Sequence, residues 1–208
     1  MNDSVTLSQY LRDGTADVHR AAERSAFVGR FVDGTLDRDA YSRHLLALHG
    51  VYSTLEGALE RSRSESRIRP FVLPELWRTE AIAADLAFLR GPDWAGEEPV
   101  PAARDYVLRL DALDRGEPLR LVSHAYVRYL GDLSGGQMLK KLAARILGLD
   151  GDGLRFYEFP AIADPGAFKA EFRRRLDTLA VVDGEREALL DEAREAFRLN
   201  AAIFAQLV

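Results

Sequence analysis

Residues 126–137 read Tyr-Val-Arg-Tyr-Leu-Gly-Asp-Leu-Ser-Gly-Gly-Gln, inside a segment whose apolar residues recur every three or four positions, the period of a helix. Three glycines, Gly131, Gly135 and Gly136, fall within six residues. Each costs a helix interior about 1 kcal/mol relative to alanine, so the segment gives up roughly 3 kcal/mol of local preference. A helix with such glycines either bends or lets something flat and wide approach its backbone. Asp132 between them indicates that this ligand needs a carboxylate.

The composition is typical of a soluble globular protein. The 208 residues fit one domain, 1–208, with a substantial core, and the net charge of −5 does not favour nucleic acid as a partner. The chain contains no cysteine, which excludes disulfides, thiolate metal sites and a cysteine nucleophile. The sequence shows neither a signal-peptide pattern nor an apolar run near the roughly 18 residues of a membrane span, so we expect a cytoplasmic protein without a membrane anchor.

Helical periodicity and capping residues extend over almost the whole chain. The expected helices span about 6–23, 27–32, 37–63, 74–90, 101–115, 118–147, 165–179, and a last one from an Asp183 cap to the end. Segment 148–165 is rich in glycine and aspartate and is expected to be a connection. Because no strand alternation is present, the sequence predicts an all-α, single-domain helical bundle with antiparallel neighbours.

A helix whose glycines carry no side chains lets a planar macrocycle lie against its backbone, and haem is the obvious candidate. Haem needs an axial ligand on its other face, which here must come from histidine, methionine or tyrosine. His19 is a candidate metal ligand, because Arg12, Thr15 and Glu23 lie near one side of the same predicted helix. Glu23 can hydrogen-bond the far imidazole nitrogen. Arg12, about 10 Å along the helix axis, can reach a propionate.

Each of these residues also has a purely structural interpretation. A lone helix histidine such as His19 is more often a partly buried residue paired with a carboxylate. His44, His49 and His124 are interpreted as packing groups.

Two stretches together resemble the haem oxygenase family: residues 126–137 and residues 11–23, Leu-Arg-Asp-Gly-Thr-Ala-Asp-Val-His-Arg-Ala-Ala-Glu. Further segments similar to the family follow in family order at 51–56, 85–88, 156–160, 168–173 and 196–200, so the resemblance runs essentially end to end. Without a membrane tail, the chain is most similar to the soluble bacterial, biliverdin-producing members.

The resemblance implies haem as both cofactor and substrate, held between a proximal helix and a glycine-kinked distal helix. His19 is implied as the ligand of the haem iron. The other implied haem contacts are Arg12, Glu23, Tyr126, Gly131, Gly135, Gly136, Lys169, Arg173 and Phe197. The implied catalytic residues of the distal side are Tyr52, Arg128, Gly131, Asp132, Gly135 and Asn200, with Tyr129 in the same polar network. Ala16 departs from the pattern, because mammalian relatives carry a propionate-side lysine there.

The implied reaction uses O2 and external electrons and yields biliverdin, carbon monoxide and ferrous iron. As a hypothesis, Asp132 orders water that delivers protons without touching the iron. The glycine backbone then steers attack toward one meso carbon, with the α position expected. The donor is expected to be a ferredoxin, a flavodoxin or an NAD(P)H-dependent reductase. A basic patch is predicted to dock this donor and attract the propionates; it comprises Lys140, Lys141, Arg145, Lys169, Arg173, Arg174 and Arg175.

Other interpretations of the same residues stay open at the level of sequence. Tyr52 lies on an apolar stripe and fits core packing equally well, and a structural role for Asn200 is about as expected as a site-facing one. A haem carrier without turnover would keep His19 and the glycines but would not need Asp132. An enzyme of the helical thiaminase type has a related bundle but needs a cysteine nucleophile. A cofactor-free interaction protein leaves the three glycines unexplained.

Overall fold

The computed structural model describes residues 5–182 and 184–208, which form ten α-helices with short 3₁₀ turns and contain no strand. The all-α prediction is thereby confirmed. The helices are α1 (Leu7–Gly14), α2 (Ala16–Glu23), α3 (Ala26–Val32), α4 (Arg38–Arg61), α5 (Thr79–Arg90), α6 (Pro101–Gly116), α7 (Leu121–Asp132), α8 (Gly135–Leu147), α9 (Pro165–Asp177) and α10 (Glu185–Ala205).

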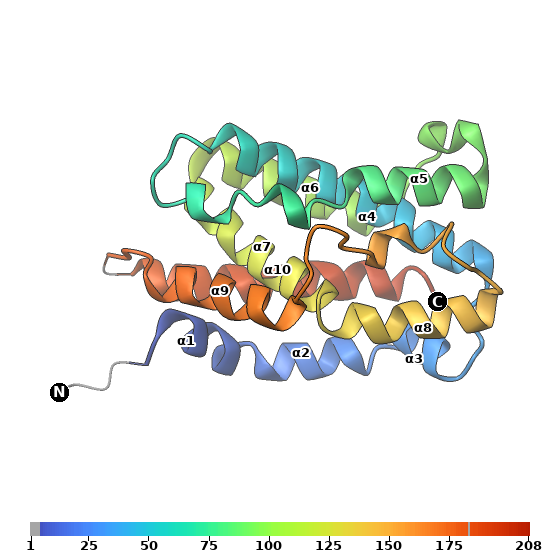
Figure 1. Cartoon of the computed structure of the whole chain (residues 1–208). Helices are drawn as coiled ribbons and strands as arrows, with labels where there is room; N and C mark the ends of the chain where they lie inside the picture. The colour runs from blue at the N-terminus through green and yellow to red at the C-terminus, as the bar shows by residue number, and fades with distance from the viewer. Residues whose placement is uncertain (1–4, 183) are drawn as a thin grey trace.

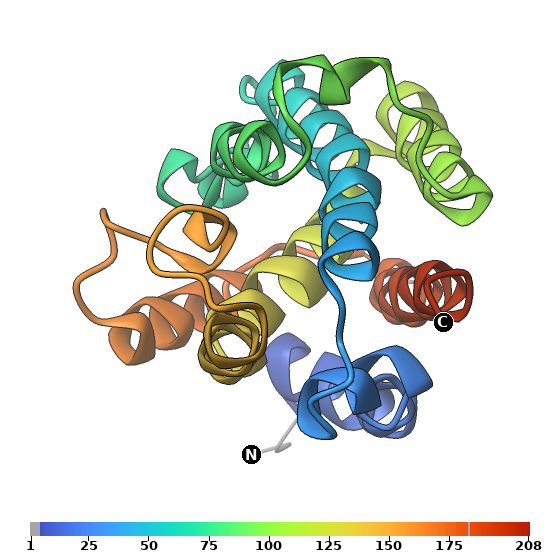
Figure 2. The same ribbon diagram turned by 90° about the vertical axis from the view of Figure 1, so that its right-hand side faces the viewer.

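The helices are arranged around α7 and α10, which pack against each other across the middle of the bundle (Figure 1). Helix α4 packs against α5 and α6 on one side. Helices α1–α3 run along the opposite side, below α8 and α9 in Figure 1. Figure 2, a perpendicular view, also shows α1–α3 on the side opposite to α4–α6. Within the described ranges, no helix is both long enough and apolar enough to cross a membrane.

The helix expected over 118–147 is interrupted, so that prediction is wrong in its continuity. A 3₁₀ turn covers Pro118–Arg120, α7 ends at Asp132, and α8 begins at Gly135. The intervening Ser134 has φ −111° and ψ −88°, outside the helical region. Hydrophobic periodicity continues through this short break, which is why the pattern alone does not reveal it.

The N-terminal helix expected over 6–23 is also divided, at Thr15. The Thr15 hydroxyl donates to the Leu11 carbonyl at 2.8 Å, and α2 starts at the next residue. Gly14 lies against α10 so closely that a Cβ there would be 2.6 Å from Leu190 Cδ1. The Arg194 Nε atom donates to the Gly14 carbonyl at 2.9 Å. Close packing on α10 therefore sets the position of this break.

The other predicted boundaries hold to within a few residues, with two differences. Helix α5 starts only at Thr79, because Pro74–Leu76 forms a separate 3₁₀ turn. The predicted Asp183 cap lies outside the described residues, and α10 follows Gly184, whose φ is +83°. The helix expected from about Asp37 is α4, and the side chain of Asp37 caps it by accepting from the Ala40 backbone N–H at 2.7 Å.

His44 is a buried packing group, in agreement with its interpretation from sequence. Its ring lies 5.0 Å from that of Phe27 and 5.6 Å from that of Phe204. Its Nδ1 atom has no hydrogen-bond partner among the described residues. Burial, aided by the positive charge of Arg128, lowers the pKa of His44 from 6.5 to about 3. The native protein therefore holds this imidazole neutral while the unfolded chain protonates it.

Replacing His44 with leucine is expected to remove an acid-sensitive part of the stability. Between pH 6.5 and about 3 only the unfolded state binds this proton, so wild type loses stability as the pH falls. At pH 5 this loss is about 2 kcal/mol. Urea unfolding measures the free energy of unfolding of each protein. The value for the variant minus the value for wild type should be larger by about that amount at pH 5 than at pH 8. An equal difference at the two pH values would contradict the assignment.

Candidate active site

A buried polar cluster joins α4, α7 and α10. The Tyr52 hydroxyl of α4 donates to Asp132 Oδ2 at the end of α7. Arg128 Nε donates to the Tyr52 oxygen at 3.1 Å, and Arg128 Nη1 donates to Asn200 Oδ1 of α10 at 2.7 Å. All four side chains are buried, and the structure thus brings together four residues that the sequence proposed for the distal side.

The cluster contains two buried ionisable side chains of opposite charge, Asp132 and Arg128. Burial raises the pKa of Asp132, an effect opposed by the charge of Arg128 and the hydrogen bond from Tyr52. Burial also lowers the pKa of Arg128, but Tyr52 and Asp132 outweigh it, so the net pKa is raised and the guanidinium stays charged. The cluster therefore contains a permanent cation beside a carboxylate whose proton affinity is increased, which suits a group that takes up and returns protons.

The glycines around the α7–α8 break form a surface without side chains. Gly131 and Gly135 are exposed, and a Cβ added to either would meet no heavy atom of the described residues within 4 Å. Gly136 is buried, and a Cβ there would lie 3.5 Å from the ring of Tyr157. Two of the three predicted glycines therefore border open space, while the third packs inward.

His19 lies on α2, a helix that buries none of its residues 16–23. Its side chain is 53% exposed, and its Nδ1 atom is 3.7 Å from Glu23 Oε2, the partner predicted from sequence. The Phe197 ring of α10 contacts the imidazole edge to face at 5.7 Å between centroids. The imidazole is thus oriented by two neighbours and still accessible to a ligand.

The predicted propionate-side residues come from α1, α7 and α9. Burial raises the pKa of Tyr126, and the charges of Arg173 and Arg12 act against it, which places both guanidinium groups near this hydroxyl. Lys169 Nζ lies 3.0 Å from Ser134 Oγ, beside the α7–α8 break. Cationic side chains therefore gather next to the glycine surface.

These residues fit haem. An accessible imidazole, an open backbone surface at Gly131 and Gly135, and nearby cations correspond to the iron, the flat face and the propionates of a haem group. His19 would bind the iron, and Arg12, Lys169 and Arg173 would bind the carboxylates.

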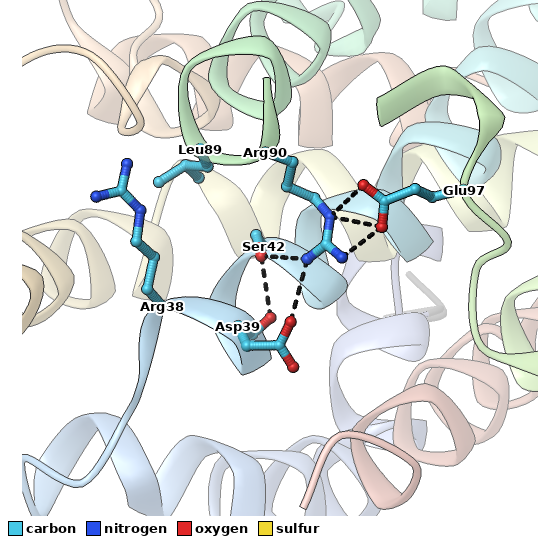
Figure 3. A pocket seen from close by; sticks show the side chains of 6 residues that line it. All are labelled: Arg38, Asp39, Ser42, Leu89, Arg90 and Glu97. Atoms are coloured by element: carbon cyan, nitrogen blue, oxygen red, sulfur yellow. Dashed lines mark hydrogen bonds and ion pairs between the residues drawn. The ribbon is translucent and has the colours of Figure 1, made fainter. Parts of the chain in front are cut away.

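A hollow of about 310 Å³ at the surface between α4 and α5 is not a competing site (Figure 3). Its central cation, Arg90, donates to Ser42 Oγ at 2.7 Å and to Glu97 Oε1 at 2.8 Å, and contacts Asp39 at 3.3 Å. Because the guanidinium is occupied by these partners, it offers little to a ligand.

Sequence reasoning missed a second buried cluster, on the same face of α7 one turn before Arg128. His124 Nε2 lies 2.9 Å from Glu192 Oε1, and its Nδ1 atom lies 3.0 Å from the Tyr106 hydroxyl. Arg109 Nε donates to the same Glu192 oxygen at 2.9 Å. Burial raises the pKa of Glu192, but the hydrogen bonds from His124 and Arg109 dominate and lower it to about 2. The four-residue spacing of His124, Arg128 and Asp132 was the available signal.

Comparison with known proteins gives a consistent result. The model of the family described as Heme oxygenase matches residues 5–206. A heme oxygenase from Guillardia theta is 41% identical over 206 residues, which cover 98% of this chain and 87% of the relative. The solved heme oxygenase of Leptospira interrogans has a TM-score of 0.92 at 44% identity, covering 97% of this chain and 99% of that one. Heme oxygenase-1 of the cyanobacterium Synechocystis, solved in complex with heme, has a TM-score of 0.94 at 36% identity, covering 98% and 92%. Since the family model spans nearly the whole chain, the resemblance inferred from sequence is confirmed and the protein belongs to the haem oxygenase family.

Proposed function

We propose that residues 1–208 act as one domain that binds haem between His19 and the surface of Gly131 and Gly135. Proteins of this family cleave haem to biliverdin, carbon monoxide and ferrous iron with O2 and external electrons, and haem is both their substrate and their prosthetic group. The observation that carries the proposal is the buried Asp132 cluster at the α7–α8 break, where Gly131 and Gly135 border open space.

The residues of the proposed haem site have distinct roles. His19 binds the iron, while Glu23 and Phe197 orient its imidazole. Arg12, Tyr126, Lys169 and Arg173 bind the propionates, and the cations provide most of the attraction. Gly131 and Gly135 keep side chains away from the reacting face, and Gly136 holds the start of α8 against Tyr157.

Asp132 acts as the proton-handling group of the proposed mechanism. Bound haem supplies the redox chemistry with O2. Asp132 orders water at the glycine surface and holds a proton at its carboxylate. Tyr52 fixes one carboxylate oxygen, Arg128 keeps its charge balanced, and Asn200 fixes the guanidinium. The glycine backbone leaves room for the attack on one meso carbon, which we expect to be α.

A haem carrier would need the same imidazole and the same glycines. It would not need a buried carboxylate with a raised pKa beside those glycines, whereas a proton-handling enzyme does. The position and raised pKa of Asp132 therefore favour turnover over storage.

Replacing His19 with alanine is expected to abolish the histidine-ligated absorption spectrum of the hemin complex, because the other histidines of the described residues lie in the core or against Trp94. The change should be followed by hemin titration and by electron paramagnetic resonance. His49→Ala, on the partly buried face of α4 against Trp94, is the matched control and should keep the spectrum of wild type. An unchanged spectrum for His19→Ala would exclude this residue as the ligand.

Replacing Asp132 with alanine is expected to preserve hemin binding but to lower biliverdin formation by about 100-fold or more, the usual size of a proton-transfer contribution. Bilin absorbance and chromatography of the products under air with a reductant provide the measurement. Asp93→Ala, which removes an exposed carboxylate, should behave like wild type. Undiminished biliverdin formation by the Asp132 variant would refute its role. Persistence of the Soret band in wild type would point to a carrier.

We further propose that the electron donor is an acidic cytoplasmic protein, a ferredoxin, a flavodoxin or an NAD(P)H-dependent reductase, docked on the basic patch. Several of its cations are already paired: Lys140 with Glu158 at 2.8 Å, and Arg174 and Arg175 with Glu171 at 2.7 and 2.9 Å. Lys141, Arg145 and Arg173 are left as the main candidates for steering an anionic partner.

If this docking is electrostatic, donor-driven turnover should fall as ionic strength rises, because salt screens charges beyond about 10 Å at 0.1 M. Lys141→Glu combined with Arg145→Glu should raise the KM for the donor severalfold and leave hemin affinity unchanged. Turnover driven by ascorbate serves as the control, since a small reductant needs no docking surface. If neither salt nor charge reversal changes donor-driven turnover, the donor does not dock on this surface.

A further inference from the structure

Helix α2 carries His19 but contributes no buried residue to the core. Its first turn has no side-chain cap, because the hydroxyl of the preceding Thr15 is donated to the Leu11 carbonyl at 2.8 Å. Packing of an apolar face supplies most of the stability of helices in proteins. This source is weak for α2, so the position of the His19 imidazole depends on the contacts that neighbouring elements make with the helix and with its ends.

One side of α10 runs beside α1, α2 and α3. Four of its residues, spaced by four, three and seven positions, lie on one face of the helix and are called here the proximal stripe: Leu190, Arg194, Phe197 and Phe204. The stripe contacts Gly14 at the end of α1, His19 of α2 and Phe27 of α3. A single face of α10 therefore supports the three N-terminal helices in chain order.

The α1–α2 break contacts the proximal stripe through the backbone of Gly14. A Cβ atom there would lie 2.6 and 2.7 Å from Cδ1 and Cδ2 of Leu190, so glycine permits this approach. The Gly14 carbonyl is the last of α1, and carbonyls at the end of a helix have no intrahelical partner. Arg194 Nε donates to this carbonyl at 2.9 Å, and a cation at a helix C-terminus is also favoured by the helix dipole. Arg194 thus fastens the break to α10 five residues before His19.

Helix α10 also reaches the buried polar cluster of α4, α7 and α10. Asn200 accepts from Arg128 at 2.7 Å, and it follows Phe197 by three residues, about 4.5 Å along the helix axis. The helix that contacts the His19 ring therefore also holds the guanidinium that lies beside Asp132. It serves as a common base for both sides of the proposed haem site. A shift of α2 relative to α10 would change where the imidazole lies relative to the cluster.

We propose that Arg194 is a positioning residue for His19. Its hydrogen bond to the Gly14 carbonyl holds the α1–α2 break on α10, and α2 then presents the imidazole beside Phe197. Asp191, whose Oδ1 atom lies 3.9 Å from Arg194 Nη1, is on the same helix and keeps the guanidinium close to α10. The consequence for the iron rests on the proposed function, whereas the anchoring of α2 does not.

The first test uses the apoprotein and Arg194→Met, which removes the donors and the charge but keeps an unbranched side chain. The nuclear Overhauser contact between the ring protons of His19 and Phe197 should weaken, because α2 loses its anchor. Arg194→Lys, which retains a charged donor, should restore it. The matched control is Arg198→Met, since Arg198 is also an exposed arginine of α10 but bonds Glu195 of its own helix, at 2.6 Å. An unchanged contact in Arg194→Met, or equal weakening in the control, would overturn the inference.

The second test uses the hemin complex of the same variants. Arg194→Met should raise the Kd for hemin about fivefold, the weight of one hydrogen bond, because fewer molecules hold α2 in the binding position. The iron–histidine stretching band in resonance Raman spectra of the ferrous complex should shift or broaden, which reduced stability alone does not cause. Arg198→Met should match wild type in both measurements. Unchanged affinity together with an unchanged band in Arg194→Met would overturn the inference.

The two tests separate this inference from the proposed function. A wild-type hemin complex without an iron–histidine band would overturn the proposed function, and with it the part of the inference that concerns the iron. The apoprotein contact between His19 and Phe197 would still decide whether Arg194 anchors α2. Conversely, a normal iron–histidine band in wild type with no response to Arg194→Met in either test would leave the proposed function intact and overturn only the role of Arg194.

Discussion

The buried guanidinium of Arg128 is the interaction on which the site depends. It bonds Tyr52 of α4 and Asn200 of α10, and it balances Asp132 on its own helix. A buried cation is tolerated only when its hydrogen bonds and its charge are both satisfied. These three partners satisfy it by fixing the relative positions of three helices. The same requirement that allows Arg128 into the core therefore places Asp132 behind the glycine surface.

The glycines and the buried cluster act together. Ordinary side chains at Gly131 and Gly135 would cover the open backbone surface that we propose for the haem face. The break between α7 and α8 turns these glycines outward and Gly136 inward, against Tyr157. One short stretch of chain thus provides both an accessible backbone and the buried carboxylate for which we propose proton handling.

Much of the fold and site was predictable because the signals are local. Helical periodicity gave most helix boundaries, and α4 begins within one residue of its expected start at Asp37. His19 and Glu23 are one helical turn apart, so their approach follows from spacing alone. The division at Ser134 was missed because the hydrophobic period continues across it. The division at Thr15 was missed because it depends on packing against α10, where Leu190 approaches the adjacent Gly14.

By itself the sequence determined the helical class, the family and the residue types of the site, since these follow from periodicity, local motifs and the chemistry of side chains. Tertiary structure alone decided which groups meet. Arg128 finds its amide partner 72 residues away, and the Tyr41 hydroxyl donates to the Gly153 carbonyl 112 residues away. The reason is physical: the pairing of buried polar groups depends on how distant helices pack, and no local pattern encodes that packing.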